Sequence, residues 1–320
     1  MAVALLAGAL LVPAPPSFHL GHGARAGASA AVAAAARLPC PAYRPNGPYP
    51  LVGERGVEAV LDQPGVLASH GLPLRTDPAS GLAYRNIDDI AFYGLEGWTH
   101  WRRTGRRSGL AQARRAGDWL VAHQPAGGGW RYPISVSLAG LGIERPLRPG
   151  WVAAQAEGDS ISLLVRLYRA TSQVVYLRAA ERALGPYQRP SGRHGFRVLF
   201  RHHVFYDGFP TSPPSLVLED FHVSLLGVAD LSPFDRTAAH LFDQGLRSLY
   251  WALPLLDDGQ GKPLYSLSYL TAPGAPRVYE APAHTENALF LCELARMRPS
   301  PRALHYAALW EASDPHAFYR

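Results

Sequence analysis

The sequence contains few of the residues on which several protein classes depend. Its 320 residues include two cysteines, Cys40 and Cys292, and one lysine, Lys262, so almost all of the 31 basic residues are arginine. Two cysteines cannot provide a framework of several disulfides or a zinc site made of thiolates. A single bridge between Cys40 and Cys292 and a pair of free thiols are both compatible with the sequence.

Long apolar runs and nucleic-acid signatures are also missing. No apolar run approaches the roughly 20 residues that span a bilayer, so we expect no integral membrane span. The formal net charge is +6, but the arginines are scattered apart from short pairs such as Arg102-Arg103 and Arg106-Arg107. A nucleic-acid binder usually gathers its basic residues on one face, with aromatic residues between them. We therefore predict no nucleic-acid partner.

Motifs for metals, phosphates and serine nucleophiles are absent as well. His202, His203, His222 and Asp220 lack the ligand spacing of a known metal motif, and we predict no metal site. The glycine run at 127–129 follows a predicted helix instead of opening one, which is typical of a helix end and not of a phosphate loop. No G-x-S-x-G sequence is present.

The first forty residues are unlike the rest of the chain. Residues 2–12 have the length of the apolar part of a signal peptide, and small residues follow through Ala36. Positive residues before this apolar part are missing, so a disordered leader is the alternative. Export predicts a secreted or cell-envelope protein, and the alternative predicts a cytoplasmic one. We expect the fold to lie within 41–320, with a loop-rich lead-in at 67–87.

Helical periodicity dominates the chain beyond this lead-in. The predicted helices cover 88–104, 108–124, 152–171, 174–188, 215–231, 234–254, 283–297 and 301–312. Pairs of these helices alternate with linkers rich in Gly, Pro and aromatic residues, at 127–136, 192–215 and 261–282, where short hairpins or extended loops are expected. This repeating pattern predicts one mainly α domain, an (α/α) toroid or barrel of helix pairs with hairpin loops at one end. An open helical solenoid is the alternative.

The linkers gather the residue types that bind sugars. Aromatic faces stack on pyranose rings, and guanidinium groups pair with carboxylates. Candidates in or beside the last two linkers are Tyr206, Asp207, Tyr265, Tyr269, Arg277, Tyr279, Glu280, His284 and Glu286. Each of them could equally be a packing or solvated residue. As a group on neighbouring loops they favour a binding site.

Three segments resemble the C-terminal domain of the D-glucuronyl C5-epimerases. They are PGWVAAQAEGDSISLLVRLYRAT at 149–171, GFPTSPPSLVLEDFHVSLLGVADL at 208–231 and HTENALFLCEL at 284–294. IAFYGLEGW at 90–98 and DWLVAHQPAGGGW at 118–130 resemble two further family segments in the same order. The β-sandwich that animal members carry between these two segments has no counterpart here.

The resemblance implies an α/α barrel that converts glucuronate to iduronate within heparosan-type polysaccharides. Such an epimerase removes the proton at C5 of a uronate, next to the carboxylate, and returns a proton to the opposite face. Groups that stabilise negative charge on the carboxylate are needed, and no cofactor is obligatory.

The family's site residues carry over unevenly. The tyrosine of its Tyr-Asp-Leu-Arg loop matches Tyr265, and a second tyrosine best matches Tyr279, ahead of His284. The family's Glu-Tyr before Pro-Thr is replaced by Gly208 and Phe209, which removes a carboxylate and a phenol. Its loop arginine is replaced by Ser268, and Arg277 is a candidate substitute.

The leading hypothesis is a uronosyl C5-epimerase acting on a bacterial acidic polysaccharide. The proposed catalytic residues are Tyr279, Tyr265, Asp207, His284 and Glu280. The proposed substrate-binding residues are Arg277, Tyr206, Phe209, Trp130, Arg131, Trp151, Tyr84, Tyr93 and Tyr269. The alternatives are a polysaccharide lyase or glycoside hydrolase in the same cleft, or a catalytically silent glycan-binding protein. A homodimer is also left open.

Overall fold

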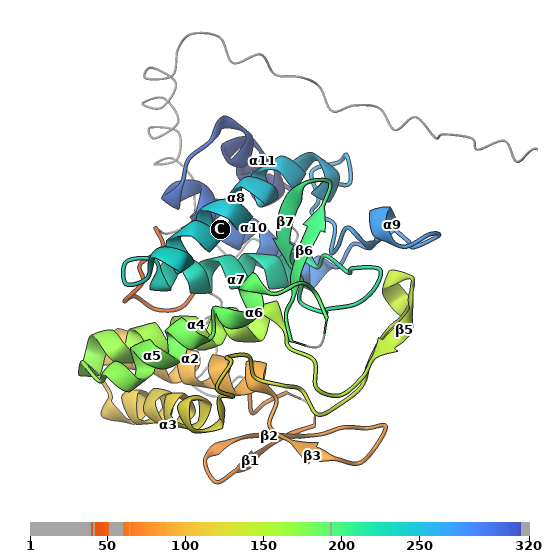
Figure 1. The fold of residues 1–320 in the computed structure, drawn as a ribbon. Helices are drawn as coiled ribbons and strands as arrows, with labels where there is room; N and C mark the ends of the chain where they lie inside the picture. The colour runs from red at the N-terminus through yellow and green to blue at the C-terminus, as the bar shows by residue number, and fades with distance from the viewer. Residues whose placement is uncertain (1–39, 41, 51–59, 64, 193, 315–320) are drawn as a thin grey trace, which may run out of the picture.

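The computed structural model describes residue 40 and residues 42–50, 60–63, 65–192 and 194–314, and it is mainly helical (Figure 1). Its long helices are α2 (Ile87–Thr104), α3 (Arg107–His123), α4 (Ala154–Thr171), α7 (Leu218–Leu231), α8 (Arg236–Leu256), α10 (Ala281–Met297) and α11 (Pro301–Ala312). The shorter helical segments are α5 (Val174–Arg182), α6 (Gly185–Gln188), α9 (Ser268–Thr271) and the 3-10 turn η1 (Ala139–Leu141).

The strands form three small antiparallel sheets. The first has the order β1 (Val66–Ser69), β2 (Leu72–Thr76) and β3 (Ala83–Tyr84). The other two are the pairs β4 (Val136–Leu138) with β5 (Ile143–Leu147), and β6 (Arg197–Phe200) with β7 (His203–Tyr206). Leu199 pairs with Val204 and Phe200 with His203, so Arg201 and His202 form the tight turn of the last hairpin.

The predicted helices are confirmed within a few residues at their ends, except that the helix predicted over 174–188 is divided into α5 and α6. Local signals explain why, since Asn86 caps α2 by accepting hydrogen bonds from two backbone N–H groups, and Gly105 ends that helix in the left-handed conformation at φ 72°. The lead-in at 67–87, expected to be loop-rich, instead holds the three-stranded sheet. Its strands have two to five residues, too short to show an alternating pattern. In the third linker, residues 261–282 hold the short helix α9.

The helices form a row of antiparallel pairs. α4 packs against α2 on one side and α7 on the other, and α7 in turn packs against α10. A second helix lies against each of these four, as α3, α5, α8 and α11 (Figure 1). Packing of α2 against α10, which would close a ring, is not among the main helix contacts of the described ranges. The alternation of helix pairs is therefore confirmed, while the closed toroid stays a prediction.

Glycine allows the two central helices to approach closely. A Cβ on Gly158 of α4 would lie 2.6 Å from the carbonyl oxygen of Val223 in α7. A Cβ on Gly227 of α7 would lie 2.4 Å from the carbonyl oxygen of Gly158. Any side chain at either position would push the helices apart. The first half of α4 therefore packs against the middle and second half of α7 at a short separation.

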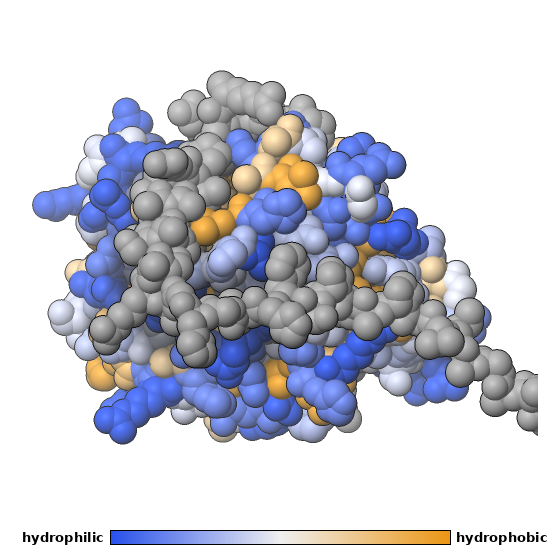
Figure 2. All heavy atoms as spheres, turned by 90° about the horizontal axis from the view of Figure 1, so that it is seen from above, coloured by the Kyte–Doolittle hydropathy of each residue, from blue (hydrophilic) through white to orange (hydrophobic). Residues whose placement is uncertain are grey.

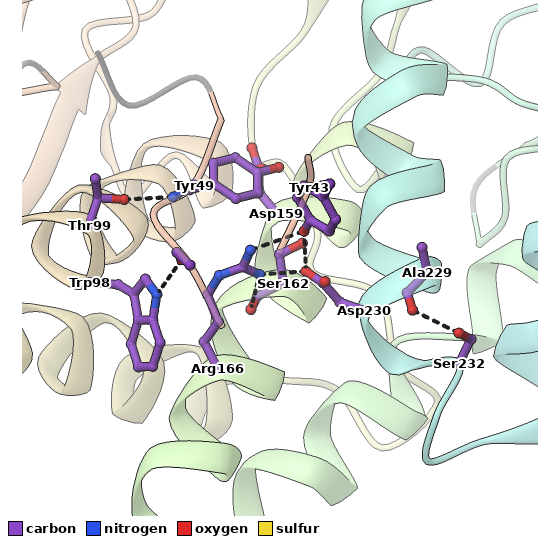
Figure 3. A network of polar contacts seen from close by, with 11 residues as sticks. Tyr43, Tyr49, Trp98, Thr99, Asp159, Ser162, Arg166, Ala229, Asp230 and Ser232 are labelled. Atoms are coloured by element: carbon purple, nitrogen blue, oxygen red, sulfur yellow. Dashed lines mark hydrogen bonds and ion pairs between the residues drawn. The ribbon is translucent and has the colours of Figure 1, made fainter. Parts of the chain in front are cut away.

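A buried ion pair lies between the same two helices (Figure 3). Arg166 of α4 pairs with Asp230 of α7, and both side chains are completely buried. Arg166 also donates to the carbonyl of Ser162 at 3.0 Å and to the Tyr43 hydroxyl at 3.0 Å, while Tyr43 donates to Asp230 at 2.7 Å. The guanidinium also lies over the ring of Tyr49, 5.2 Å from its centroid. The segment 42–50 is thus anchored in the helical core.

Residues 40–50 connect all four central helices. A disulfide joins Cys40 to Cys292 in α10, and Tyr49 donates to Asp159 in α4 at 2.5 Å. The Tyr49 backbone N–H donates to Thr99 in α2 at 2.8 Å (Figure 3). Of the two alternatives left by the sequence, the structure therefore has the bridge and not the free thiols.

On the face seen from above, the described residues are mainly hydrophilic, with hydrophobic atoms in smaller areas (Figure 2). The large hydrophobic side chains that are exposed include Leu199, Val174 and Phe234, which lie on separate elements. None of the helices in the described ranges has the length and apolarity of a membrane-crossing segment.

Candidate functional site

A cavity of about 180 Å³ lies where the amino ends of α2, α4 and α7 meet. Its wall is formed by Asn86, Asp88, Tyr132, Ile134, Val136, Trp151, Ala153, Gln155, Gly208, Phe209 and Asp220. Asn86 already accepts from two backbone N–H groups of α2, but the amino ends of α4 and α7 have no side-chain cap, and the helix dipole adds positive potential there. The position therefore suits a ligand that carries negative charge.

Aromatic residues form one side of this cavity. The rings of Tyr132 and Trp151 are stacked, with centroids 4.1 Å apart, and the Trp151 and Phe209 rings lie 5.7 Å apart. Trp151 donates its indole N–H to the carbonyl of Ile134 at 3.0 Å, which fixes the orientation of the ring. Trp151 and Phe209 were both proposed from the sequence as substrate-binding residues, and both lie in the wall.

Two carboxyl groups from different helices face this wall. Asp88 lies in the first turn of α2 and Asp220 in the first turn of α7. Burial, reinforced by the charges of Asp207 and Asp159, raises the pKa of Asp220 to about 8. Burial and the charges of Asp159 and Asp220 also raise the pKa of Asp88 well above its usual range. Oδ2 of Asp220 and Oδ1 of Asp88 have no hydrogen-bond partner in the described part of the chain.

Tyr265 lies beside a second group of carboxyls. Burial raises the pKa of its phenol, and the charges of Asp220, Glu219, Glu280 and Glu286 raise it further. The side chain packs against the same small apolar cluster as Phe209. The charged neighbours of Tyr265 are acidic, so they do not favour the phenolate that a tyrosine base would need. Tyr265 therefore keeps its proton at neutral pH.

Asp207 stabilises the loop that carries Gly208 and Phe209. Its carboxylate accepts hydrogen bonds from the Ser215 hydroxyl, from the Ser215 N–H at 3.0 Å and from the Leu216 N–H at 2.9 Å. Burial raises the pKa of Asp207 to about 7, and these bonds oppose that effect. With both oxygens engaged and the side chain fully buried, Asp207 holds the loop and does not line the cavity.

Tyr279, Glu280 and His284 lie at or just before the amino end of α10. The Tyr279 hydroxyl is 3.1 Å from His284 Nδ1, and His284 Nε2 is 2.9 Å from the carbonyl oxygen of Trp310. A carbonyl can only accept, so Nε2 carries the proton and Nδ1 accepts from Tyr279. The ring of Tyr279, 36% exposed, also lies near the Lys262 ammonium group.

Most of the other proposed binding residues are engaged elsewhere. The Tyr206 hydroxyl donates to the Leu241 carbonyl at 2.8 Å, and the Trp130 indole donates to the Leu120 carbonyl at 2.9 Å. Tyr93 is buried in α2. Tyr84 is half-buried in β3, and Arg131 is exposed with a nitrogen 3.2 Å from His194.

Arg277, the expected substitute for the family's loop arginine, is also bound to residues outside the cavity wall. Arg277 donates to the carbonyl of Asp257 at 3.0 Å and lies over the Tyr269 ring, while Tyr269 donates to the Leu255 carbonyl at 2.7 Å. Ser268, at the position of that arginine, is buried with its hydroxyl 2.9 Å from that of Ser266. The cavity wall contains no arginine or lysine among the residues that the structure describes.

Sequence reasoning missed Asp88, Asn86, Tyr132 and Gln155, and it considered Asp220 only as a metal ligand. The sequence does carry a signal for Asp88 and Asp220, since acidic residues lie in the first turns of both α2 and α7. No group of three or more metal-ligating side chains occurs among the described residues. His222 is instead buried against Asn287, and burial lowers its pKa to about 3.

Comparison with known proteins decides the family. The model of the D-glucuronyl C5-epimerase C-terminus matches residues 124–312, more than half of the chain. The chain belongs to this family. A D-glucuronyl C5-epimerase from Caenorhabditis elegans is 34% identical over 190 residues, which is 55% of this chain and 30% of the worm protein. The chain therefore spans less than a third of the length of that curated relative.

Two similar solved structures are unsaturated glucuronyl hydrolases. The one from Streptococcus agalactiae has a TM-score of 0.44 at 15% identity and covers 72% of this chain and 56% of its own. The one from Bacillus sp. GL1, described as responsible for the degradation of glycosaminoglycan, has a TM-score of 0.45 at 19% identity. It covers 72% of this chain and 62% of its own.

Proposed function

We propose that this C5-epimerase family member is a uronosyl C5-epimerase that acts on an acidic polysaccharide at the cavity between α2, α4 and α7. The observation that carries the proposal is that Trp151, Gln155, Phe209 and Asp220 all lie within the family-matched region and line one cavity. This cavity combines an aromatic wall with two carboxyl groups whose pKa values are raised by burial, that of Asp220 to about 8, so Asp220 can exchange a proton at slightly alkaline pH.

The amino ends of the helices take the place of a cation in this proposal. The uronate carboxylate would lie near the first turns of α4 and α7, which have no side-chain cap, with the amides of Asn86 and Gln155 as further donors. An ionised carboxylate of the wall removes the C5 proton. Tyr265 packs on the same apolar cluster as Phe209 and is the candidate proton donor, although it is not one of the residues that line the cavity.

Exchange of the C5 hydrogen tests this function directly. The protein is incubated in heavy water with an unsulfated heparosan-type polymer and with other glucuronate-containing polymers. We expect deuterium at C5 of the uronate and the appearance of the C5 epimer, both measured by NMR. A neutral polymer such as dextran is the control. Binding of a uronate polymer without any exchange would contradict the proposal and favour a silent glycan-binding protein.

A glycoside hydrolase is the second candidate, because two carboxyls, Asp88 and Asp220, line one cavity. A hydrolase needs such a pair on either side of the glycosidic bond. In the same incubations it would release new reducing ends without deuterium at C5. A lyase would instead give an unsaturated product that absorbs ultraviolet light.

Phe209 provides a test of the binding wall. Replacing Phe209 with alanine removes half-buried aromatic surface, and we expect KM for the polymer to rise roughly 5- to 30-fold, about 1–2 kcal/mol, with a smaller change in kcat. Phe200 is the matched control, because it is also a half-buried aromatic residue but packs on Trp251 away from the cavity. Equal effects of the two substitutions on KM would contradict a role for Phe209 in binding.

We also propose that the protein works outside the cytoplasm, in the cell envelope or as a secreted protein. The support is the Cys40–Cys292 disulfide, since such bonds persist in oxidising compartments and are rare in the cytosol. Of the predicted leader at 1–40, residues 1–39 lie outside the described residues, and Cys40 belongs to the folded domain because it is bonded to Cys292.

A further inference from the structure

We propose that Asp220 is the catalytic carboxylate that takes the proton from C5, and that position 208 is glycine because the Asp220 carboxylate fills the space above it. This assignment rests on the proposed epimerase function. It names the base that the cavity would use, which the family pattern does not assign to the start of α7.

The first step of the argument is the geometry around Gly208. A Cβ built on Gly208 would lie 1.5 Å from Oδ2 of Asp220 and 2.2 Å from its Cγ. The backbone of Gly208 does not have a positive φ, so its conformation alone does not demand glycine. What excludes a side chain at 208 is the carboxylate of Asp220. The two positions are therefore coupled: a side chain can project into this space from 208 or from 220, but not from both.

The second step is the state of the Asp220 side chain. Asp220 is 5% exposed, it lines the cavity, and its Oδ2 has no hydrogen-bond partner among the described residues. An unpaired buried carboxyl oxygen is costly for stability, and Asp220, unlike the unpaired buried carboxyl Glu293, lines the cavity. The neighbouring carboxyl, Asp207, differs because its oxygens accept three hydrogen bonds from Ser215 and Leu216. Asp220 is thus the available carboxylate beside this loop.

The third step connects this arrangement to the family pattern. The resemblance described above places a glutamate at position 208, where this chain has glycine. Asp220 enters the same space from the neighbouring helix, so a carboxylate is present at this place in the cavity despite the loss at 208. The missing glutamate is then no sign of an inactive site.

The chemistry of the step balances without a cofactor. The Asp220 carboxylate, in its ionised form, takes the proton from C5, and the electron pair of the C5–H bond moves into the uronate carboxylate to give an enediolate. A proton then adds to C5 from the opposite face, with Tyr265 as the candidate donor, and the electron pair returns to form the new C–H bond. Asp220 and the donor recover their initial protonation states by exchange with water.

Substitution of Asp220 is the first test. We expect Asp220→Asn, which keeps the shape of the side chain, to lower the rate of C5 deuterium exchange about 10²–10⁴-fold, with KM changed by less than about threefold. Glu293→Gln is the matched control, because Glu293 is also buried, has an unpaired Oε2 and has a pKa raised by burial to about 8, yet it does not line the cavity. This variant should keep the wild-type rate.

Exchanging the two positions is the sharper test. The double variant Gly208→Glu/Asp220→Gly should regain at least about a tenth of the wild-type rate, while Gly208→Glu alone should be inactive because its side chain collides with Asp220. Should the double variant fail to fold, Asp220→Gly in added formate provides the second measurement. Formate supplies a carboxylate to the space vacated by Asp220, and we expect a formate-dependent gain in rate.

The outcomes separate the inference from the proposed function. If the wild type exchanges the C5 hydrogen and Asp220→Asn keeps more than half of that rate, Asp220 is not the base, although the epimerase function stands. A folded but inactive double variant, together with no response to formate, likewise overturns the assignment. If the wild type exchanges no uronate polymer, the proposed function itself fails.

Discussion

Replacing Arg166 with methionine should lower the free energy of unfolding by about 3–5 kcal/mol. Arg166 and Asp230 are both fully buried, and removal of the guanidinium leaves the Asp230 carboxylate with no cation beside it. The same substitution removes the hydrogen bonds to the Ser162 carbonyl and the Tyr43 hydroxyl. Urea unfolding followed by circular dichroism measures the loss.

Two further variants test whether the loss of stability is caused by the unpaired buried charge. The double variant Arg166→Met/Asp230→Leu removes both charges, and we expect it to be more stable than Arg166→Met alone, because no unpaired charge stays buried. Arg178→Met is the exposed control. Its pair with Glu181 lies on the surface of α5, where such pairs contribute about 0–1 kcal/mol. A double variant no more stable than Arg166→Met would show that the buried charge is not the cause.

Reduction of the Cys40–Cys292 disulfide should destabilise the protein by about 4–5 kcal/mol. The bridge joins residues separated by 252 positions, so it restricts most of the unfolded chain. Its loss also frees the segment that carries Tyr43 and Tyr49 into the helical core. The measurement is the urea midpoint of the oxidised and the reduced protein.

A cysteine-free variant provides the control for this experiment. Cys40→Ala/Cys292→Ala should unfold at the lower midpoint of the reduced wild type, and added reductant should not shift it further. If the wild type has the same midpoint with and without reductant, the bridge does not contribute to stability in solution.

The helices were predictable because their information is local. Apolar residues recur at helical spacing, and capping residues such as Asn86 and Gly105 mark the ends. The sheet at 66–84 was not predictable in this way, since its strands are too short for a periodic signal. The pairing of Cys40 with Cys292 was undecided for a related reason, as it depends on where α10 lies relative to the amino-terminal segment.

The candidate site was predictable only in part. Trp151 and Phe209 were proposed for the aromatic wall, because aromatic residues in linkers are a property of the sequence. The meeting of Asp88 with Asp220 depends on how α2, α4 and α7 pack together, and no spacing in the sequence reports it. The hydrogen bonds of Asp207 and the collision above Gly208 are likewise properties of the folded loop.

The packing of α2 and α3 against α4 has a consequence for the cavity wall. The family-matched region begins at residue 124, yet the cavity wall also takes Asn86 and Asp88 from α2, which precedes it. The part of the chain that the family model matches is thus smaller than the part that forms the cavity wall. Substitutions at Asn86 or Asp88 alter the cavity wall without changing the matched region.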